Sequence, residues 1–185
     1  MLSLSLCPSH NVATQLVDCA GGFNNFGCNG GLPSQAFEYL KYAGGHDTED
    51  VYPYTAKDGK CSFDGRGVAH VTQINNITAY DEDELMQAVG SAGPVSIAFQ
   101  VAKDFRFYDK GVYDGVCDSA PSSVNHAVVA VGYGRTKSVL PWKGQEYFIV
   151  RNSWGASWGV DGYFLIKRGV NKCGLADCAS FPTVA

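Results

Sequence analysis

Hydrophobic and polar residues alternate with a helical spacing in only one place within the first third of the chain. Residues 20–33 are dense in Gly and Asn, which excludes a regular element there. Residues 33–45 begin with proline, place Ala36, Phe37 and Leu40 on one side and end with two glycines. This pattern predicts a short helix that starts at the proline and stops at the glycines.

A second helical pattern occupies residues 81–93. Asp81 and Glu84 form an acidic variant of the capping box, and three acidic residues in the first turn suit the positive end of the helix dipole. Leu85 and Val89 lie on its apolar side, and a Gly-Pro pair follows. We therefore predict a helix that ends just before residue 93.

From residue 94 the spacing changes to that of β-strands. Val95, Ile97, Phe99 and Val101 alternate with other residues, as in a strand with one buried face. Three further strands are predicted, within residues 126–134, 146–154 and 161–169. The first of these is nearly all apolar, which is typical of a strand covered on both faces. Helix and loop in the first half and mainly antiparallel strands in the second half indicate an α+β fold, with a boundary near residues 74–80.

Composition narrows the class of protein. The 185 residues are 45% hydrophobic and 17% charged, which is typical of a globular chain. A net charge of −4 argues against a nucleic-acid partner, and no apolar run approaches the roughly 20 residues that cross a bilayer. We expect a monomer. Asn76 begins an Asn-Ile-Thr glycosylation sequon.

Seven cysteines favour an oxidising compartment, and their odd number leaves at least one thiol without an intramolecular partner. They are Cys7, Cys19, Cys28, Cys61, Cys117, Cys173 and Cys178. The four histidines are His10, His46, His70 and His126. None of them has the spacing of a zinc site, so we expect neither a metal nor a cofactor.

His126 stands directly in front of the apolar run 127–131. Taken by itself, this position is typical of a hydrogen-bonded histidine at the end of a strand. Asn152 ends the next predicted strand, and Trp154 follows it. An amide oxygen can hold an imidazole in one tautomer, and an indole over that hydrogen bond keeps water away. The set therefore also fits a catalytic base.

The order and spacing of eight sequence blocks make the chain resemble the papain-like cysteine proteases over roughly residues 15–185. The blocks are QLVDCA, GCNGGLP, YPY, GPVSIAF, NHAVVAVGYG, RNSWGASWG, DGYF and NKCGLADCASFP. The stretches 20–42 and 173–185 are most similar to the cathepsin H and aleurain branch of that family. The resemblance implies a two-lobe fold: an incomplete helical left lobe (15–76) and an antiparallel β-barrel right lobe with a C-terminal tail (77–185). Residues 1–14 would be an atypical lead.

The resemblance also implies roles for individual residues. His126 would be the general base, Asn152 would orient it and Trp154 would shield the pair. Gly30 and Gly31 would bind an extended peptide through their backbone. The pocket for the second residue before the scissile bond would be formed by Leu32, Pro33, Ala98, Val124 and Cys178. Two disulfides are implied, Cys19–Cys61 and Cys117–Cys173.

No nucleophile with the sequence C-G-[SA]-C-[WY] occurs in the 185 residues. In this family that motif precedes the histidine by roughly 130 residues or more, so we expect the thiol to precede residue 1. The oxyanion-hole Gln and the helix that carries the Cys would be missing with it. Cys7 lies only 119 residues before His126 and has no Gly-Ser turn, which makes it a poor substitute. A disulfide between Cys7 and Cys28 is another possibility.

The implied function is that of a cysteine-type peptidase of which this chain is an inactive C-terminal fragment. The alternative is a non-catalytic module that binds peptides or inhibitors. Implied partners are peptide or protein substrates, cystatin-like inhibitors and a propeptide minichain tethered through Cys178. The implied location is the vacuole or lysosome, or the extracellular space, reached by the secretory pathway.

Overall fold

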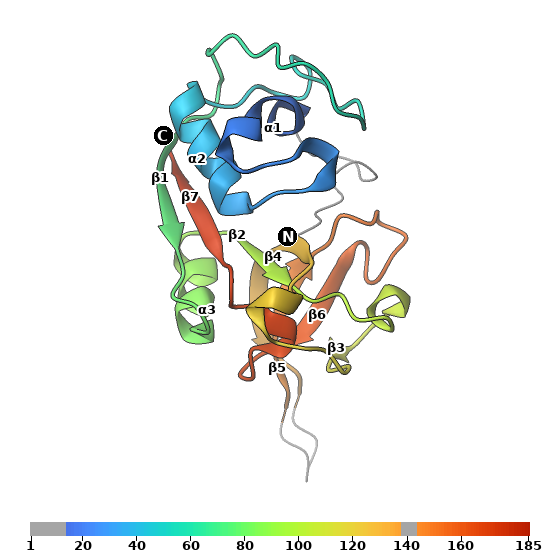
Figure 1. Ribbon diagram of the computed structural model, residues 1–185. Coiled ribbons are helices and arrows are strands. Elements are labelled where there is room, and N and C mark those ends of the chain that lie inside the picture. The colour runs from blue at the N-terminus through green and yellow to red at the C-terminus, as the bar shows by residue number, and fades with distance from the viewer. Residues whose placement is uncertain (1–13, 138–143) are drawn as a thin grey trace. The chain divides into compact units, whose positions relative to one another are not determined.

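The computed structural model describes residues 14–137 and 144–185 (Figure 1). The chain divides into two compact units: residues up to Asn76 together with Ser180–Ala185, and residues Ile77–Ala179. The C-terminal tail, Ser180–Ala185, thus belongs to the first unit. It does so because Ser180 and Val184 pair with Asn76 and Val71 in an antiparallel ladder.

From residue 14 onward, the first unit contains two α-helices, two 3-10 turns and one pair of strands. They are α1 (Thr14–Cys19), η1 (Ala20–Phe23), η2 (Gly27–Asn29), α2 (Pro33–Ala43), β1 (Val71–Asn76) and β7 (Ser180–Val184). The strand β1 is missing from the sequence prediction. Its sequence VTQINN is mostly polar and largely exposed, so it lacks the alternation that identifies a half-buried strand.

The helix α2 begins and ends where its sequence predicts. Pro33 occupies the first turn, and Gly44 ends the helix with a φ of 93° while its N–H donates to the carbonyl of Leu40. Tyr39 and Leu40 are buried against Ala20 and neighbouring apolar side chains. No helix among the described residues is long and apolar enough to cross a membrane.

Outside residues 138–143, the second unit contains one α-helix, five strands and three 3-10 turns. They are α3 (Glu82–Ser91), β2 (Val95–Phe99), η3 (Phe105–Phe107), β3 (Val112–Tyr113), η4 (Pro121–Ser123), β4 (His126–Arg135), β5 (Glu146–Arg151), β6 (Tyr163–Lys167) and η5 (Lys172–Gly174). Its strands follow the order β2-β4-β5-β6-β3. All neighbours are antiparallel except β3 and β6, which are parallel. The α+β class is confirmed, with a mostly antiparallel sheet.

The start of α3 confirms one half of the predicted capping box and corrects the other. The Asp81 carboxylate accepts the N–H groups of Asp83 and Glu84, at 3.1 and 2.8 Å. Glu84 does not reach back to Asp81. Its carboxylate accepts the N–H of Thr78 at 2.8 Å, because the chain turns before the cap and the Asp81 N–H already donates to the Thr78 carbonyl.

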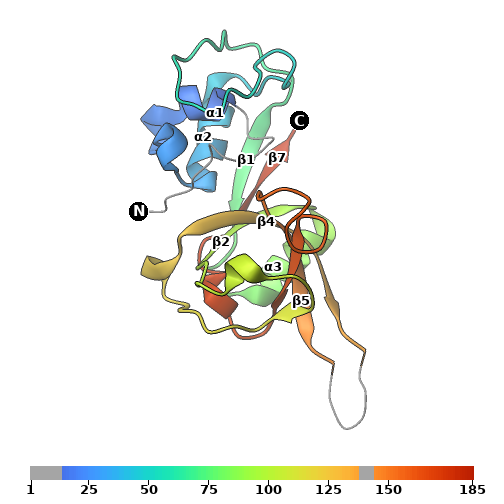
Figure 2. The ribbon, with the colours of Figure 1, turned by 90° about the vertical axis from the view of Figure 1, so that its right-hand side faces the viewer.

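The core of the second unit lies on the alternating positions of its strands. Ile97, Phe99, Phe148, Val150, Phe164 and Ile166 are all at most 1% exposed. The strand β4 was expected to be covered on both faces, and this is wrong for its second half. Val131 and Tyr133 are 37% and 45% exposed, since the later part of β4 projects with the start of β5 as a two-stranded ribbon (Figure 2).

Candidate active site

The ends of two neighbouring strands bring His126 and Asn152 together. His126 is the first residue of β4, where it pairs with Phe99 of β2. Asn152 follows Arg151, the last residue of β5, and Arg151 pairs with Val129 of β4. The amide oxygen of Asn152 lies 2.9 Å from Nε2 of His126. Residues 26 positions apart in sequence thus form a direct hydrogen bond.

Neighbouring backbone groups decide which end of the Asn152 amide faces the imidazole. The N–H of Ser153 donates to Oδ1 of Asn152 at 2.8 Å, and an N–H group can only donate, so this atom is the oxygen. The same oxygen contacts Nε2 of His126, which must therefore carry the proton and donate. Nδ1 is then left as the basic nitrogen. Among the described residues, none forms a hydrogen bond with Nδ1.

Burial keeps water away from this pair. Asn152 is only 7% exposed, and its own N–H donates to the carbonyl of Gly162 at 2.9 Å. The ring of Trp154 lies 5.2 Å from that of His126, with 31° between the two planes. Because the indole covers the imidazole, the hydrogen bond to Asn152 is less exposed to competition from solvent.

The aromatic cluster behind Trp154 was not recognised from the sequence. Phe105 is fully buried, and its ring centroid lies 5.7 Å from that of Trp154 and 5.2 Å from that of Trp158. Trp158 packs edge-on against Trp154 at 4.9 Å and donates its indole N–H to the carbonyl of Arg106 at 3.0 Å. The stretch KDFRFY, rich in aromatic residues within a polar loop, was the available signal.

Three effects set the pKa of His126. Burial, the largest, lowers it from its ordinary value, and the hydrogen bond that the ring donates to Asn152 raises it. The positive charge of Arg106 lowers it further. The balance favours the neutral imidazole, which is the form that accepts a proton.

The residues predicted to bind substrate are divided between the two units. Gly30, Gly31, Leu32 and Pro33 belong to the first unit, and Ala98, Val124 and Cys178 belong to the second. That all seven line one site stays a prediction.

Within the first unit, the two glycines have different roles. Gly30 has a φ of 99°, and its N–H and C=O both take part in the turn, with Gly27 and Phe26. Gly31 forms no hydrogen bond with any described residue. A Cβ on Gly31 would come within 1.8 Å of the Asn25 side chain, which also accepts the N–H of Leu32. A larger residue at Gly31 would therefore displace Asn25.

Within the second unit, Ala98 and Val124 are buried, and Cys178 is exposed. Cys178 is the free cysteine of the described part of the chain. Partial burial, reinforced by the charge of Asp177, raises the pKa of its thiol. The thiol is consequently protonated at neutral pH and is a weak nucleophile.

Both predicted disulfides, Cys19–Cys61 and Cys117–Cys173, are present. The possibilities raised for Cys7, as a nucleophile or as the partner of Cys28, lie outside the described residues. Of Cys28 itself, the backbone N–H donates to the carboxylate of Asp58 at 2.7 Å.

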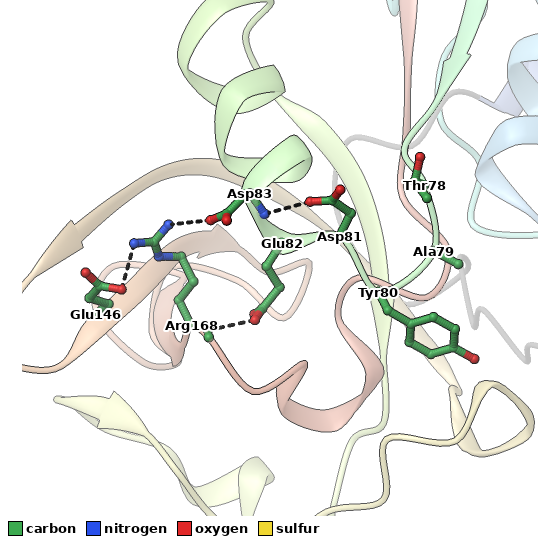
Figure 3. Close-up of a pocket in the computed structure, with 9 residues that line it drawn as sticks. Thr78, Ala79, Tyr80, Asp81, Glu82, Asp83, Glu146 and Arg168 are labelled. Carbon is green, nitrogen blue, oxygen red and sulfur yellow. Dashed lines mark hydrogen bonds and ion pairs between the residues drawn. The ribbon is translucent and has the colours of Figure 1, made fainter.

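A cavity of about 460 Å³ opens elsewhere in the second unit, at the start of α3 (Figure 3). Arg168 lies inside it, 2.7 Å from the carboxylate of Glu146 and 3.7 Å from that of Asp83. Glu82 accepts the N–H of Gly169 at 2.7 Å, and burial raises the pKa of its carboxyl group. These contacts fasten α3 to the end of β6, so the cavity is lined by a structural ion-pair network.

Comparisons with known proteins identify the family of the chain. Residues 9–183 match the family model described as "Papain family cysteine protease". The chain belongs to the papain family of cysteine proteases.

Its relatives include proteins named as aleurain-like thiol proteases and as pro-cathepsin H. The chain is 56% identical over 173 residues to "Thiol protease aleurain-like" of Arabidopsis thaliana, covering 92% of the chain and 47% of that protein. It is 57% identical to "Pro-cathepsin H" of Medicago truncatula, covering 92% and 48%. Among solved structures, the digestive procathepsin L2 proteinase of Tenebrio molitor matches with a TM-score of 0.83 and 41% identity, covering 92% and 52%. The chain thus spans about half the length of the curated relatives it matches.

Proposed function

We propose that this chain carries the base and its orienting amide for peptide-bond hydrolysis by a papain-type cysteine peptidase. The observation that carries the proposal is the 2.9 Å hydrogen bond between His126 and Asn152 beneath Trp154. In this mechanism Nδ1 of His126 takes the proton of a cysteine thiol, and the thiolate attacks the carbonyl carbon of the scissile bond. The imidazolium then returns the proton to the leaving amine, and water hydrolyses the acyl-enzyme.

The thiol in this proposal comes from a C-G-[SA]-C-[WY] segment outside the 185 residues. One sequence observation and one structural observation support this. The motif is absent from the printed chain, and burial raises the pKa of the free thiol of its described part, Cys178, which makes it a weak nucleophile. The 185 residues alone would then hydrolyse no peptide. They would still offer a surface for peptides or inhibitors, the non-catalytic alternative.

Mass spectrometry of the native protein's N-terminus, combined with a fluorogenic peptide assay, tests the proposal. We expect a C-G-S-C-W peptide ahead of residue 1, turnover by that native protein, and loss of turnover in His126→Ala. We also expect none from the 185-residue chain. Turnover by the 185-residue chain that disappears in Cys7→Ser would overturn the proposal. A native start at Met1, with inhibitor binding and no turnover, would favour the binding module.

We further propose a secretory route, towards the vacuole, the lysosome or the outside of the cell, with a glycan on Asn76. The two disulfides support an oxidising compartment, and Asn76 is exposed at the end of β1. The exposed thiol of Cys178 supports its use as a tether for a minichain. Treatment with an endoglycosidase, followed by mass measurement, would detect the glycan.

A further inference from the structure

One cation beside His126 has no role in the proposed chemistry. Arg106 lies in η3 and is exposed. Within residues 14–137 and 144–185, its guanidinium forms neither a salt bridge nor a hydrogen bond. The positive charge of Arg106 nevertheless acts on His126, since it is one of the causes that lower the pKa of that imidazole. An exposed guanidinium that has no partner among the described residues, and whose charge acts on the proposed base, is available to bind an anion.

The backbone of Arg106 is fixed to the aromatic cluster that covers His126. Its carbonyl accepts the indole N–H of Trp158 at 3.0 Å, and the preceding residue, Phe105, is fully buried. Trp158 in turn packs against Trp154, which lies over the imidazole. The backbone of Arg106 is therefore held by the packed rings that cover His126, and its exposed side chain extends from that fixed point.

The proposed mechanism indicates which part of a substrate would meet this cation. Nε2 of His126 is held by Asn152, so Nδ1 is the nitrogen that must return the proton to the leaving amine. Proton transfer requires hydrogen-bond distance, which brings the leaving fragment against the imidazole. The carboxylate of Asp104, close to Arg106 in sequence, accepts the hydroxyl of Tyr113 at 3.0 Å instead of pairing with Arg106.

We propose that Arg106 selects substrates with a carboxylate on the leaving-group side of the scissile bond. The carboxylate belongs either to an acidic side chain or to a free C-terminus, and both present the same planar anion to the guanidinium. Once bound, the anion also offsets the positive field at His126 and so favours the imidazolium that pairs with a thiolate. This inference deepens the proposed function and rests on it, since it uses the same imidazole.

Binding of product-like dipeptides to the 185-residue chain tests the proposal without requiring turnover. The probes are Ala-Glu-amide, Ala-Gln with a free carboxyl terminus, and the neutral Ala-Gln-amide. NMR titration would follow the ring signals of His126 and the indole signal of Trp154. Arg106→Gln is compared with Arg66→Gln, whose exposed guanidinium pairs with Asp64 in the first unit.

We expect at least one carboxylate peptide to bind about two- to fivefold more tightly than the neutral peptide, as for an exposed ion pair. The preference should vanish in Arg106→Gln and persist in Arg66→Gln, and the tighter peptide identifies the source of the carboxylate. Equal affinities in the wild type, a preference that survives Arg106→Gln, or no shift at His126 would each overturn the inference. A native protein that cleaves peptides without this preference would keep the proposed function and lose only the inference.

Discussion

At the scale of single residues, the proposed chemistry depends on one amide and one imidazole whose hydrogen-bonding roles are set by their neighbours. Ser153 orients the Asn152 amide, and Asn152 then determines which nitrogen of His126 is basic. Burial is the largest effect on His126 and lowers its pKa below the ordinary value of about 6.5. The folded state thus favours the neutral ring. Its contribution to stability is present above the ordinary pKa and is lost as the pH falls through the lowered one.

Replacing Asn152 tests this arrangement. In Asn152→Ala we expect the pKa of His126 to fall below its wild-type value, because the hydrogen bond that raises it is lost. The pH titration of the His126 ring signals by NMR measures this shift. Asn75→Ala, a change at a half-buried position of β1 in the first unit, serves as the control and should leave the titration unchanged. If the titration of Asn152→Ala matches that of the wild type, the hydrogen bond does not raise the pKa of the His126 imidazole.

At the scale of elements, short polar contacts attach the helix α3 to the sheet of the second unit. Asp81 caps its first turn, while Glu82 accepts the N–H groups of Gly169 and Asn171. The opposite side of α3 buries Leu85 and Val89. The first turn therefore determines both where the helix begins and how it meets the end of β6.

The cap should contribute measurably to stability. Asp81→Ala removes the acceptor for two backbone N–H groups, so we expect a loss of about 1 kcal/mol in the free energy of unfolding. Asp83→Ala removes a carboxylate from the same turn, but one that is 83% exposed and 3.7 Å from Arg168. It should therefore cost less. Urea denaturation compares the two variants, and equal losses would contradict a specific contribution from the cap.

At the scale of the whole molecule, each described disulfide lies within one unit. Cys19–Cys61 closes part of the first unit and Cys117–Cys173 closes part of the second. Both are long-range, with sequence separations of 42 and 56 between the partners. A cross-link of this span restricts the unfolded chain, so each unit should depend mainly on its own disulfide.

Removing one disulfide at a time tests that independence. In Cys117→Ser with Cys173→Ser we expect the second unit to lose about 2–5 kcal/mol in its free energy of unfolding. Trp154 and Trp158 lie in the second unit, so their fluorescence reports its urea transition. Cys19→Ser with Cys61→Ser should leave this transition in place. Equal shifts in both double variants would show that the two units unfold together.

Much of the candidate site follows from the sequence because it depends on strand ends. A histidine before one apolar run and an asparagine after the next are brought together by antiparallel pairing of consecutive strands, as β4 and β5 show. The strand β1 could not be found in this way. Its polar side chains carry no periodicity, and its pairing with β7 joins residues more than a hundred positions apart. Backbone hydrogen bonds between such distant segments cannot be predicted from the local composition of either segment.

The sequence by itself determined the family, the helix that starts at Pro33 and the pairing of His126 with Asn152, because these follow from motifs and local periodicity. Only the tertiary structure decided which nitrogen of His126 is basic, since that depends on the N–H of Ser153 meeting one amide oxygen. It also placed the backbone of Arg106 against the aromatic cluster that covers His126, through the indole of Trp158, 52 residues away in sequence. Such contacts arise from packing between distant segments, and no local pattern encodes them.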